Sequence, residues 1–150
     1  MSDEYNLPLP NITNEAKPFW DGLNEDKLLI PKCNKCDHLF MYPKAYCPKN
    51  GCFSNDLSWE HVSGKGNVYS YTVVHRSADV RFQEIASQEP YVFALIELDE
   101  GPKLISNLIN VDIENIVIGT PVQIIFEKIN NEITLPKFAP ILDQGFSCLQ

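Results

Sequence analysis

Four cysteines of this chain lie close together in the sequence, at Cys33, Cys36, Cys47 and Cys52. Two residues separate the first pair, ten residues follow, and four residues separate the second pair. Cysteine pairs on two tight turns can converge on one tetrahedral metal ion, and zinc is the metal most often held in this way. The spacing therefore predicts a zinc site whose second turn is stretched, with Gly51 allowing the extra residues to fold back.

The predicted metal site is structural in character. Four thiolates fill a tetrahedron and leave no open position, so the metal could not activate a water molecule. It would instead fold a segment too short to bury a core of its own. Iron is the alternative metal, and His38 is an alternative ligand. Disulfides are disfavoured because no export signal is evident and a reducing cytosol keeps thiols reduced. Cys148 is predicted to be a bystander thiol in a C-terminal tail.

Outside the cysteines, few residues offer chemistry. His75 and Arg76 end a predicted strand, and strand alternation places His75 on one face with Tyr69 and Tyr71. One interpretation is a satisfied histidine at a strand end, and the other is a ligand-facing group with Arg76 holding an anion. We find no glycine-rich phosphate loop, no G-x-S-x-G elbow and no set of nucleophile, base and orienting residue.

The residues after position 60 predict β structure. Apolar runs bounded by turn residues predict five strands, at 67–75, 91–98, 103–109, 121–129 and 132–138. Tight turns follow from Glu100-Gly101-Pro102 and from Asn130-Asn131. Five short antiparallel strands in about 70 residues predict a small barrel of the OB type, with a half-barrel or a sandwich as the alternative.

One connection between the predicted strands is long. Residues 76–90 carry Arg76, Arg81 and Phe82, and a loop of this length in a compact domain is usually functional or mobile. It is interpreted either as a solvated insertion with one helical turn, or as a flap over a ligand site or a partner contact.

The N-terminal region predicts an extended arm and then a short helix. The apolar residues that recur at helical spacing are Ala16, Phe19, Trp20 and Leu23. Pro18 suits the first turn, and Gly22 limits the helix to about three turns. The apolar stripe either packs against a neighbouring core or offers Phe19, Trp20 and Leu23 as a docking face for a partner.

Composition places the chain among globular proteins. It has 150 residues, of which 44% are hydrophobic and 21% are charged, and its net charge is −8. Residues 31–60 carry net charge +1 and residues 61–150 carry −5, which disfavours a nucleic-acid groove. No apolar run approaches the ~18 residues that span a bilayer, and the acidic N-terminus is unlike a signal peptide. We therefore predict a cytoplasmic protein without membrane association.

The order of these motifs resembles a known family. The similarity runs through 18-PFWDGL-23, the cysteine pairs, 64-GKGNVYSYTVVHR-76, 90-PYVFALIELDEGPKLISNL-108, 119-GTPVQIIF-126 and 135-LPKFAP-140. These segments resemble the zinc-ribbon/OB-fold family of acyl-CoA-associated proteins, long catalogued as a domain of unknown function. Many members have two residues between the second pair of cysteines, where this chain has four. The resemblance implies a mainly β protein with an N-terminal arm and helix (1–29), a rubredoxin-like zinc ribbon (30–60), a five-stranded OB barrel (61–141) and a tail (142–150).

The resemblance also implies a function. Members are accessory, non-catalytic subunits that scaffold thiolase-like enzymes or hydratases of the hot-dog fold, and some help to hold the acyl-CoA. Lysines of the ribbon could meet the CoA phosphates. The candidate acyl-CoA contacts in this chain are Tyr69, Tyr71, His75, Arg76, Arg81 and Phe82. The alternatives are a protein that binds single-stranded nucleic acid and a self-sufficient small enzyme acting on acyl-CoA.

Overall fold

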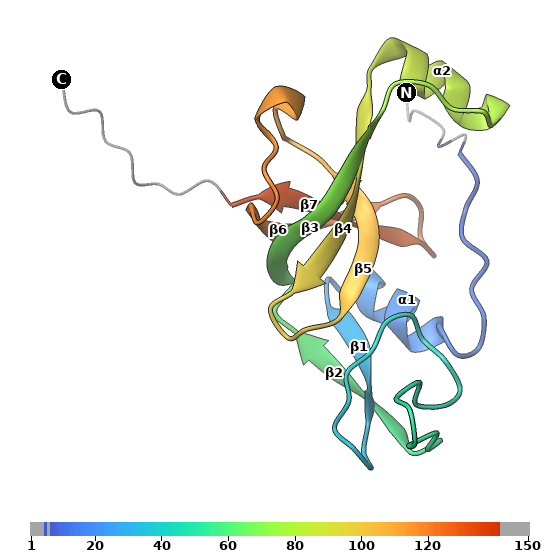
Figure 1. The fold of residues 1–150 in the computed structure, drawn as a ribbon. Helices are drawn as coiled ribbons and strands as arrows, with labels where there is room; N and C mark the ends of the chain where they lie inside the picture. Colours follow the sequence, from blue (N-terminus) through green and yellow to red (C-terminus); the bar gives the residue numbers. More distant parts are fainter. Residues whose placement is uncertain (1–4, 6, 142–150) are drawn as a thin grey trace.

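The computed structural model describes residue 5 and residues 7–141 (Figure 1). Its elements are α1 (Lys17–Asn24), β1 (Leu28–Cys33), β2 (Leu57–Val62), β3 (Lys65–Val74), α2 (Val80–Gln88), β4 (Tyr91–Leu98), β5 (Lys103–Leu108), the 3-10 turn η1 (Ile113–Asn115), β6 (Pro121–Lys128) and β7 (Thr134–Pro140). Cys148 and its predicted role lie outside the described residues. In the part that is described, no helix has the length and apolar character needed to cross a membrane.

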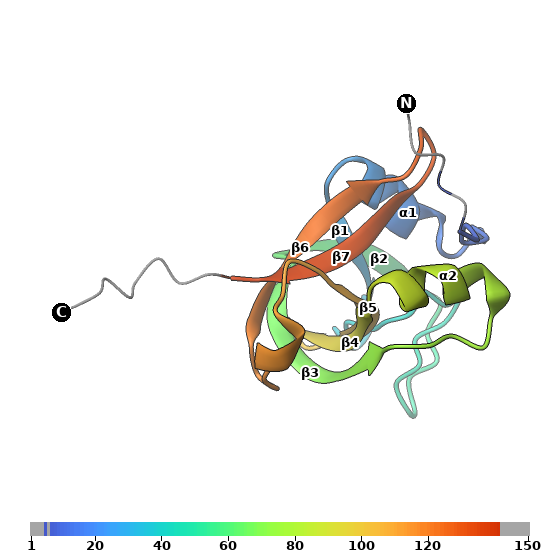
Figure 2. The same cartoon turned by 90° about the horizontal axis from the view of Figure 1, so that it is seen from above.

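Five strands close into a barrel in the order β3-β4-β5-β7-β6 (Figure 2). The predicted mainly β fold with a five-stranded OB barrel is confirmed. The expectation that all strands pair antiparallel is wrong at one place, where Leu108 of β5 lies opposite Phe138 of β7 in a parallel pair. The reason is geometric: a closed ring with an odd number of strands cannot alternate direction at every neighbour.

A β-bulge interrupts β3. The pairing with β4 shifts register between Val68 and Ser70, which leaves Tyr69 as an extra residue. Val68 therefore faces the core, Tyr69 is 50% exposed, and Tyr71 packs against the core. The predicted common face of Tyr69, Tyr71 and His75 is wrong, because the extra residue reverses the alternation along the strand.

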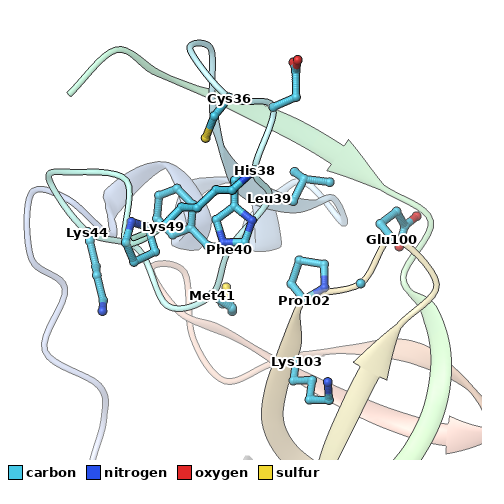
Figure 3. A pocket seen from close by; sticks show the side chains of 13 residues that line it. Cys36, His38, Leu39, Phe40, Met41, Lys44, Lys49, Glu100, Pro102 and Lys103 are labelled. Carbon is cyan, nitrogen blue, oxygen red and sulfur yellow. The ribbon is translucent and has the colours of Figure 1, made fainter. Parts of the chain in front are cut away.

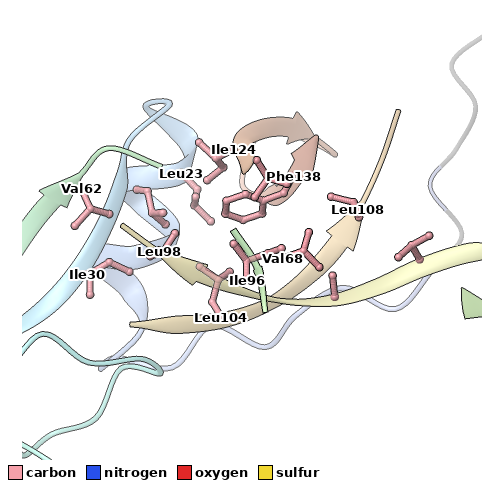
Figure 4. Close-up of a cluster of buried hydrophobic side chains, with 14 of the residues drawn as sticks. Leu23, Ile30, Val62, Val68, Ile96, Leu98, Leu104, Leu108, Ile124 and Phe138 are labelled. Atoms are coloured by element: carbon pink, nitrogen blue, oxygen red, sulfur yellow. The ribbon is translucent and has the colours of Figure 1, made fainter. Parts of the chain in front are cut away.

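One apolar cluster joins the barrel to the N-terminal region (Figure 4). Ile96 and Phe138 of the barrel belong to the same buried cluster as Leu23 of α1 and Ile30 of β1. Helix α1 contacts β1, β6 and β7, so it packs between the ribbon sheet and the barrel. Gly22 permits this close approach, because a Cβ at that position would lie 2.7 Å from Leu29 Cγ.

The ribbon sheet has only two strands. β1 and β2 pair antiparallel, from Leu28 opposite Val62 to Cys33 opposite Leu57. Between them, residues 34–56 form no helix or strand and make one bridge, from Leu39 to Lys32. The sheet itself packs on the core through Leu28, Ile30 and Val62, whereas residues 34–56 lack a ladder of strand pairs and need another source of order.

The long connection 76–90 contains helix α2, at the end of the barrel away from the ribbon (Figure 1). The side chain of Asp79 caps the helix and accepts from the Arg81 backbone N–H at 3.0 Å. Ala86 is buried and Phe82 is half-buried, which gives α2 an inner face at i and i+4. The helix has nine residues and is longer than the single turn of the solvated-insertion interpretation.

Candidate metal centre and adjoining clefts

The structure brings the sulfur atoms of the four predicted ligands together. Cys33 Sγ lies 3.7 Å from Cys52 Sγ, and Cys36 Sγ lies 3.7 Å from Cys47 Sγ. All four sulfurs lie within 4.8 Å of one another. Zinc–sulfur bonds of about 2.3 Å separate the sulfurs of a tetrahedral site by about 3.8 Å. The cluster therefore has the dimensions of a four-cysteine zinc site.

The first cysteine turn is built by backbone hydrogen bonds. The N–H of Cys33 donates to His38 O at 3.0 Å, and the N–H of Asp37 donates to Cys33 O at 2.8 Å. Asp37 adopts a left-handed conformation with φ of 56°, which aspartate tolerates better than most residues. The chain thus reverses directly after Cys36, and both sulfurs of the turn face the same point.

The second turn accommodates its two extra residues as the sequence predicts. Gly51 has φ of +80°, a conformation that glycine adopts without steric cost. The N–H of Cys52 donates to Lys49 O at 3.0 Å, and the N–H of Cys47 donates to Ser54 O at 2.8 Å. These bonds close the longer turn and return Cys52 to the cluster.

The thiols of the cluster resist ionising together. Burial raises the pKa of Cys36 to about 12 and also raises the pKa of Cys47. Burial opposes ionisation of Cys33 too, but hydrogen bonds from the backbone of Cys36 and Lys35 lower its pKa to about 7. A bound divalent cation would offset the cost of gathering several thiolates, because thiols that coordinate a metal lose their protons.

His38 is not part of the sulfur cluster. Its ring stacks on Phe40 with centroids 6.0 Å apart and an interplanar angle of 19°. The group of residues with ligand atoms close enough to share a metal contains the four cysteines alone among the described residues. The alternative in which His38 replaces a cysteine therefore has no geometric support.

A cleft of about 640 Å³ separates the ribbon from the turn between β4 and β5 (Figure 3). We call it the basic cleft, and apart from Cys36 the charged or ionisable residues that line it are Asp37, His38, Lys44, Lys49, Glu100 and Lys103. Lys103 is paired with Glu97 at 2.8 Å, whereas Lys44 and Lys49 make no ion pair with any described residue. Both free lysines are exposed, so they can meet an anion that enters the cleft.

A second cleft, of about 660 Å³, adjoins the first at Met41 and has an apolar lining. We call it the apolar groove, and its large apolar side chains are Phe19, Trp20, Met41, Tyr42, Pro43, Phe93, Leu104, Ile105, Leu135 and Pro136. Four parts of the fold meet there: the segment that precedes helix α1, helix α1 itself, the barrel strands β4, β5 and β7, and residues 37–46, which we call the ribbon loop. Sequence reasoning missed Met41, Tyr42 and Pro43, whose only signal was an apolar patch between the two cysteine pairs.

The three residues predicted to contact a partner differ in how far their side chains are exposed. Leu23 is 0% exposed and Phe19 is 6% exposed, and both belong to the core cluster. Trp20 is half-buried, makes an edge-to-face contact with Phe19, and lines the apolar groove. Leu23 is therefore a packing residue, and the prediction of a partner contact now depends on Trp20.

The residues predicted to contact acyl-CoA do not converge. Tyr69 lies beneath Lys103 Nζ, which is 4.5 Å from the ring centroid, and Tyr71 donates its hydroxyl to Ile116 O on the other side of the strand. His75 and Arg76 are exposed beyond the end of β3.

Arg81 and Phe82 lie on α2, and the Arg81 guanidinium is paired with Asp79 at 2.5 Å. A ligand phosphate would have to compete with that carboxylate. In the part of the chain that the structure describes, no single cavity is lined by all six predicted residues. Their role therefore stays a prediction.

Comparison with known proteins gives the family. Residues 20–57 match the rubredoxin-like zinc ribbon domain of ChsH2, and residues 59–127 match the C-terminal OB-fold domain of ChsH2. A DUF35 domain-containing scaffold protein of Methanothermobacter thermautotrophicus is 35% identical over 102 residues, which cover 67% of this chain and 72% of that protein. The chain belongs to the DUF35 family. The zinc-ribbon match agrees with the geometry of the four cysteines.

Two further similar proteins carry the name of an enzyme or of an enzyme subunit. A "Probable enoyl-CoA hydratase alpha subunit" of Thermomonospora curvata is 34% identical over 137 residues, which cover 91% of this chain and 41% of that protein. This chain thus spans less than half the length of that relative. A solved structure titled Ltp2-ChsH2(DUF35) aldolase superposes with a TM-score of 0.76 at 34% identity, covering 88% of this chain and 98% of that one.

Proposed function

We propose that this DUF35 protein is a non-catalytic accessory subunit that scaffolds a thiolase-like or hydratase enzyme and binds its acyl-CoA. The observation that carries the proposal is the similarity to the chain of the Ltp2-ChsH2(DUF35) aldolase, 98% of which is covered. The hydratase alpha subunit and the archaeal scaffold protein support the same class of function. A four-thiolate metal site fits a structural role, because it leaves no position for a reacting group.

The two clefts beside the ribbon suit the chemistry of acyl-CoA. The ligand is anionic at its phosphates and apolar at its acyl end, and the basic cleft adjoins the apolar groove at Met41. We propose that Lys44 and Lys49 meet the phosphates and that the acyl end enters the groove. This location competes with the predicted contacts around Arg76 and Arg81, at the opposite end of the barrel (Figure 1).

Co-purification tests the scaffold role. The tagged full chain is isolated from its native cells, and the proteins that accompany it are identified by mass spectrometry. We expect a thiolase-like or hydratase-like subunit in a fixed ratio to this chain. Trp20→Ala should weaken that association at least tenfold, whereas Val80→Ala, at a 77% exposed position on α2, should leave it unchanged. Recovery of this chain without such an enzyme would refute the scaffold role.

Calorimetry with octanoyl-CoA tests the ligand role. We expect the double variant Lys44→Ala/Lys49→Ala to weaken binding about tenfold or more, because two charge-assisted contacts are lost. Arg76→Ala is the matched variant, and it should bind like the wild type. Weakening by Arg76→Ala alone would instead favour the predicted site near α2. An absence of binding, together with a gel shift of short oligonucleotides at low salt, would favour the nucleic-acid alternative.

A further inference from the structure

The ribbon loop is fixed at both ends by predicted metal ligands. Cys36 precedes it and Cys47 follows it, and their sulfur atoms lie 3.7 Å apart. In its first half, Leu39 bridges to Lys32, and the Phe40 N–H donates to Pro31 O at 3.1 Å. The second half forms no helix or strand, so its position depends on its two ends and on what it touches.

Tyr42 joins the second half of this loop to the barrel. Its hydroxyl oxygen accepts from the backbone N–H of Ile105 in β5 at 2.8 Å. Successive residues of an antiparallel strand direct their backbone groups to opposite sides, so this N–H faces away from β4. On that side β5 meets β7 in a single residue pair, Leu108 with Phe138. The Tyr42 hydroxyl thus occupies the place that a neighbouring strand would take at Ile105.

The same loop forms one wall of each cleft. Met41, Tyr42 and Pro43 line the apolar groove, and His38 and Lys44 line the basic cleft. The opposite wall of the groove includes β5 and β7, which belong to the barrel. Both clefts therefore exist only while the ribbon loop is held against the barrel.

We infer that metal binding at the four cysteines builds these two clefts, with Tyr42 as the positioning residue that fixes the loop on β5. One neutral hydrogen bond contributes less than the conformational entropy of ordering a few loop residues, so the Tyr42–Ile105 bond cannot hold the loop alone. A metal that joins both ends removes most of that freedom. No fully buried member of the apolar cluster lies between Ile30 and Val62, and Leu39, Met41 and Trp59 are only partly buried against it, so the barrel keeps its core when the metal leaves.

Amide hydrogen exchange followed by NMR on the full chain tests this inference. In the zinc-loaded protein the Ile105 amide should exchange at least tenfold more slowly than in the chelated protein. The amide of Ile96, a buried residue of β4, should exchange at the same rate in both. Tyr42→Phe should speed exchange at Ile105 at least tenfold while its zinc content stays at that of the wild type.

Tyr46→Phe is the matched control. Tyr46 lies in the same loop, is 59% exposed, and makes no hydrogen bond through its hydroxyl to any described residue. This variant should leave exchange at Ile105 unchanged. Equal exchange at Ile105 with and without zinc would overturn the inference, as would parallel loss of protection at Ile96. Neither a partner nor acyl-CoA is used, so failure of the proposed function would leave this result intact.

Discussion

The ribbon and the barrel are ordered by different forces. The barrel closes five strands around a continuous apolar cluster that includes Ile96 and Phe138. The ribbon is anchored to that cluster through Leu28, Ile30 and Val62 of its sheet. Beyond these residues it has no fully buried member of the cluster, and its cysteine turns converge on four sulfur atoms. The difference teaches that this chain has one region stabilised by apolar burial and another stabilised by metal coordination. The clefts lie where the two regions meet, so they depend on both.

Loss of one metal ligand should have the largest effect. Cys36→Ser should abolish stoichiometric zinc binding and disorder residues 34–56, because structural zinc contributes about 10–16 kcal/mol of apparent binding free energy in small zinc domains. Elemental analysis gives the zinc content, and NMR reports the order of the ribbon and of the barrel. Cys148→Ser is the control and should retain one zinc per chain. Unfolding of the barrel in Cys36→Ser would contradict the claim that the ribbon and the barrel are stabilised by different forces.

Truncation of the barrel core should be the next largest effect. Phe138 is 0% exposed, and Phe138→Ala should lower the free energy of unfolding by about 3–5 kcal/mol because it leaves a large cavity. Phe53→Ala removes the same side chain at a 64% exposed position in the ribbon and should change stability by less than about 0.5 kcal/mol. Urea denaturation measures both. Equal losses in the two variants would contradict the division between the regions.

Regular local patterns explain what the sequence could predict. The five predicted barrel strands begin and end within two residues of the observed ones, because alternation and turn residues act over a few neighbouring positions. The metal ligands could be predicted from spacing, because the cysteine turns are built by backbone bonds between residues only a few positions apart, such as Cys33 and His38. These features need no knowledge of the rest of the fold.

Features that depend on distant contacts could not be predicted. The bulge at Tyr69 is set by the register between β3 and β4, and it separates Tyr69 from Tyr71. Two residues of the apolar groove, Tyr42 and Ile105, are hydrogen-bonded although they lie 63 positions apart. The sequence of the ribbon loop has no periodicity that would indicate such a contact. None of the six predicted ligand residues lines either cleft, and their role stays a prediction.

A close backbone contact between β3 and β4 offers a smaller change in the stability of the barrel alone. A Cβ at Gly66 would lie 2.3 Å from Glu97 O in the paired strand, so Gly66→Ala must push β3 and β4 apart. We expect a loss of about 1–3 kcal/mol in the free energy of unfolding, with zinc content unchanged. Thr72→Ala, at an exposed position of the same strand, is the matched variant and should be nearly neutral. Thermal and urea denaturation measure the stability of both variants, and elemental analysis measures their zinc content.

The smallest effect is expected at α2, which neither the metal nor the main core holds. The hydrogen bonds from Arg81 lower the pKa of the Asp79 carboxyl to about 2. A carboxyl whose pKa is lowered by folding stabilises the fold above its ordinary pKa and loses that effect as the pH falls through the folded value. The helix cap should therefore persist at pH 4 and weaken toward pH 2. As the pH is lowered, zinc should be lost before the cap weakens, because the thiolates take up protons.

Backbone chemical shifts of α2 across this pH range measure that order of events. Asp79→Ala should fray the helix at every pH, at a local cost of about 1 kcal/mol, and leave the barrel and the zinc content unchanged. Asp79→Asn keeps a capping oxygen but removes the charge, so it should hold the helix with no transition between pH 4 and pH 2. Helical shifts that survive in Asp79→Ala would mean that Ala86 and Phe82, not the cap, hold α2 on the barrel.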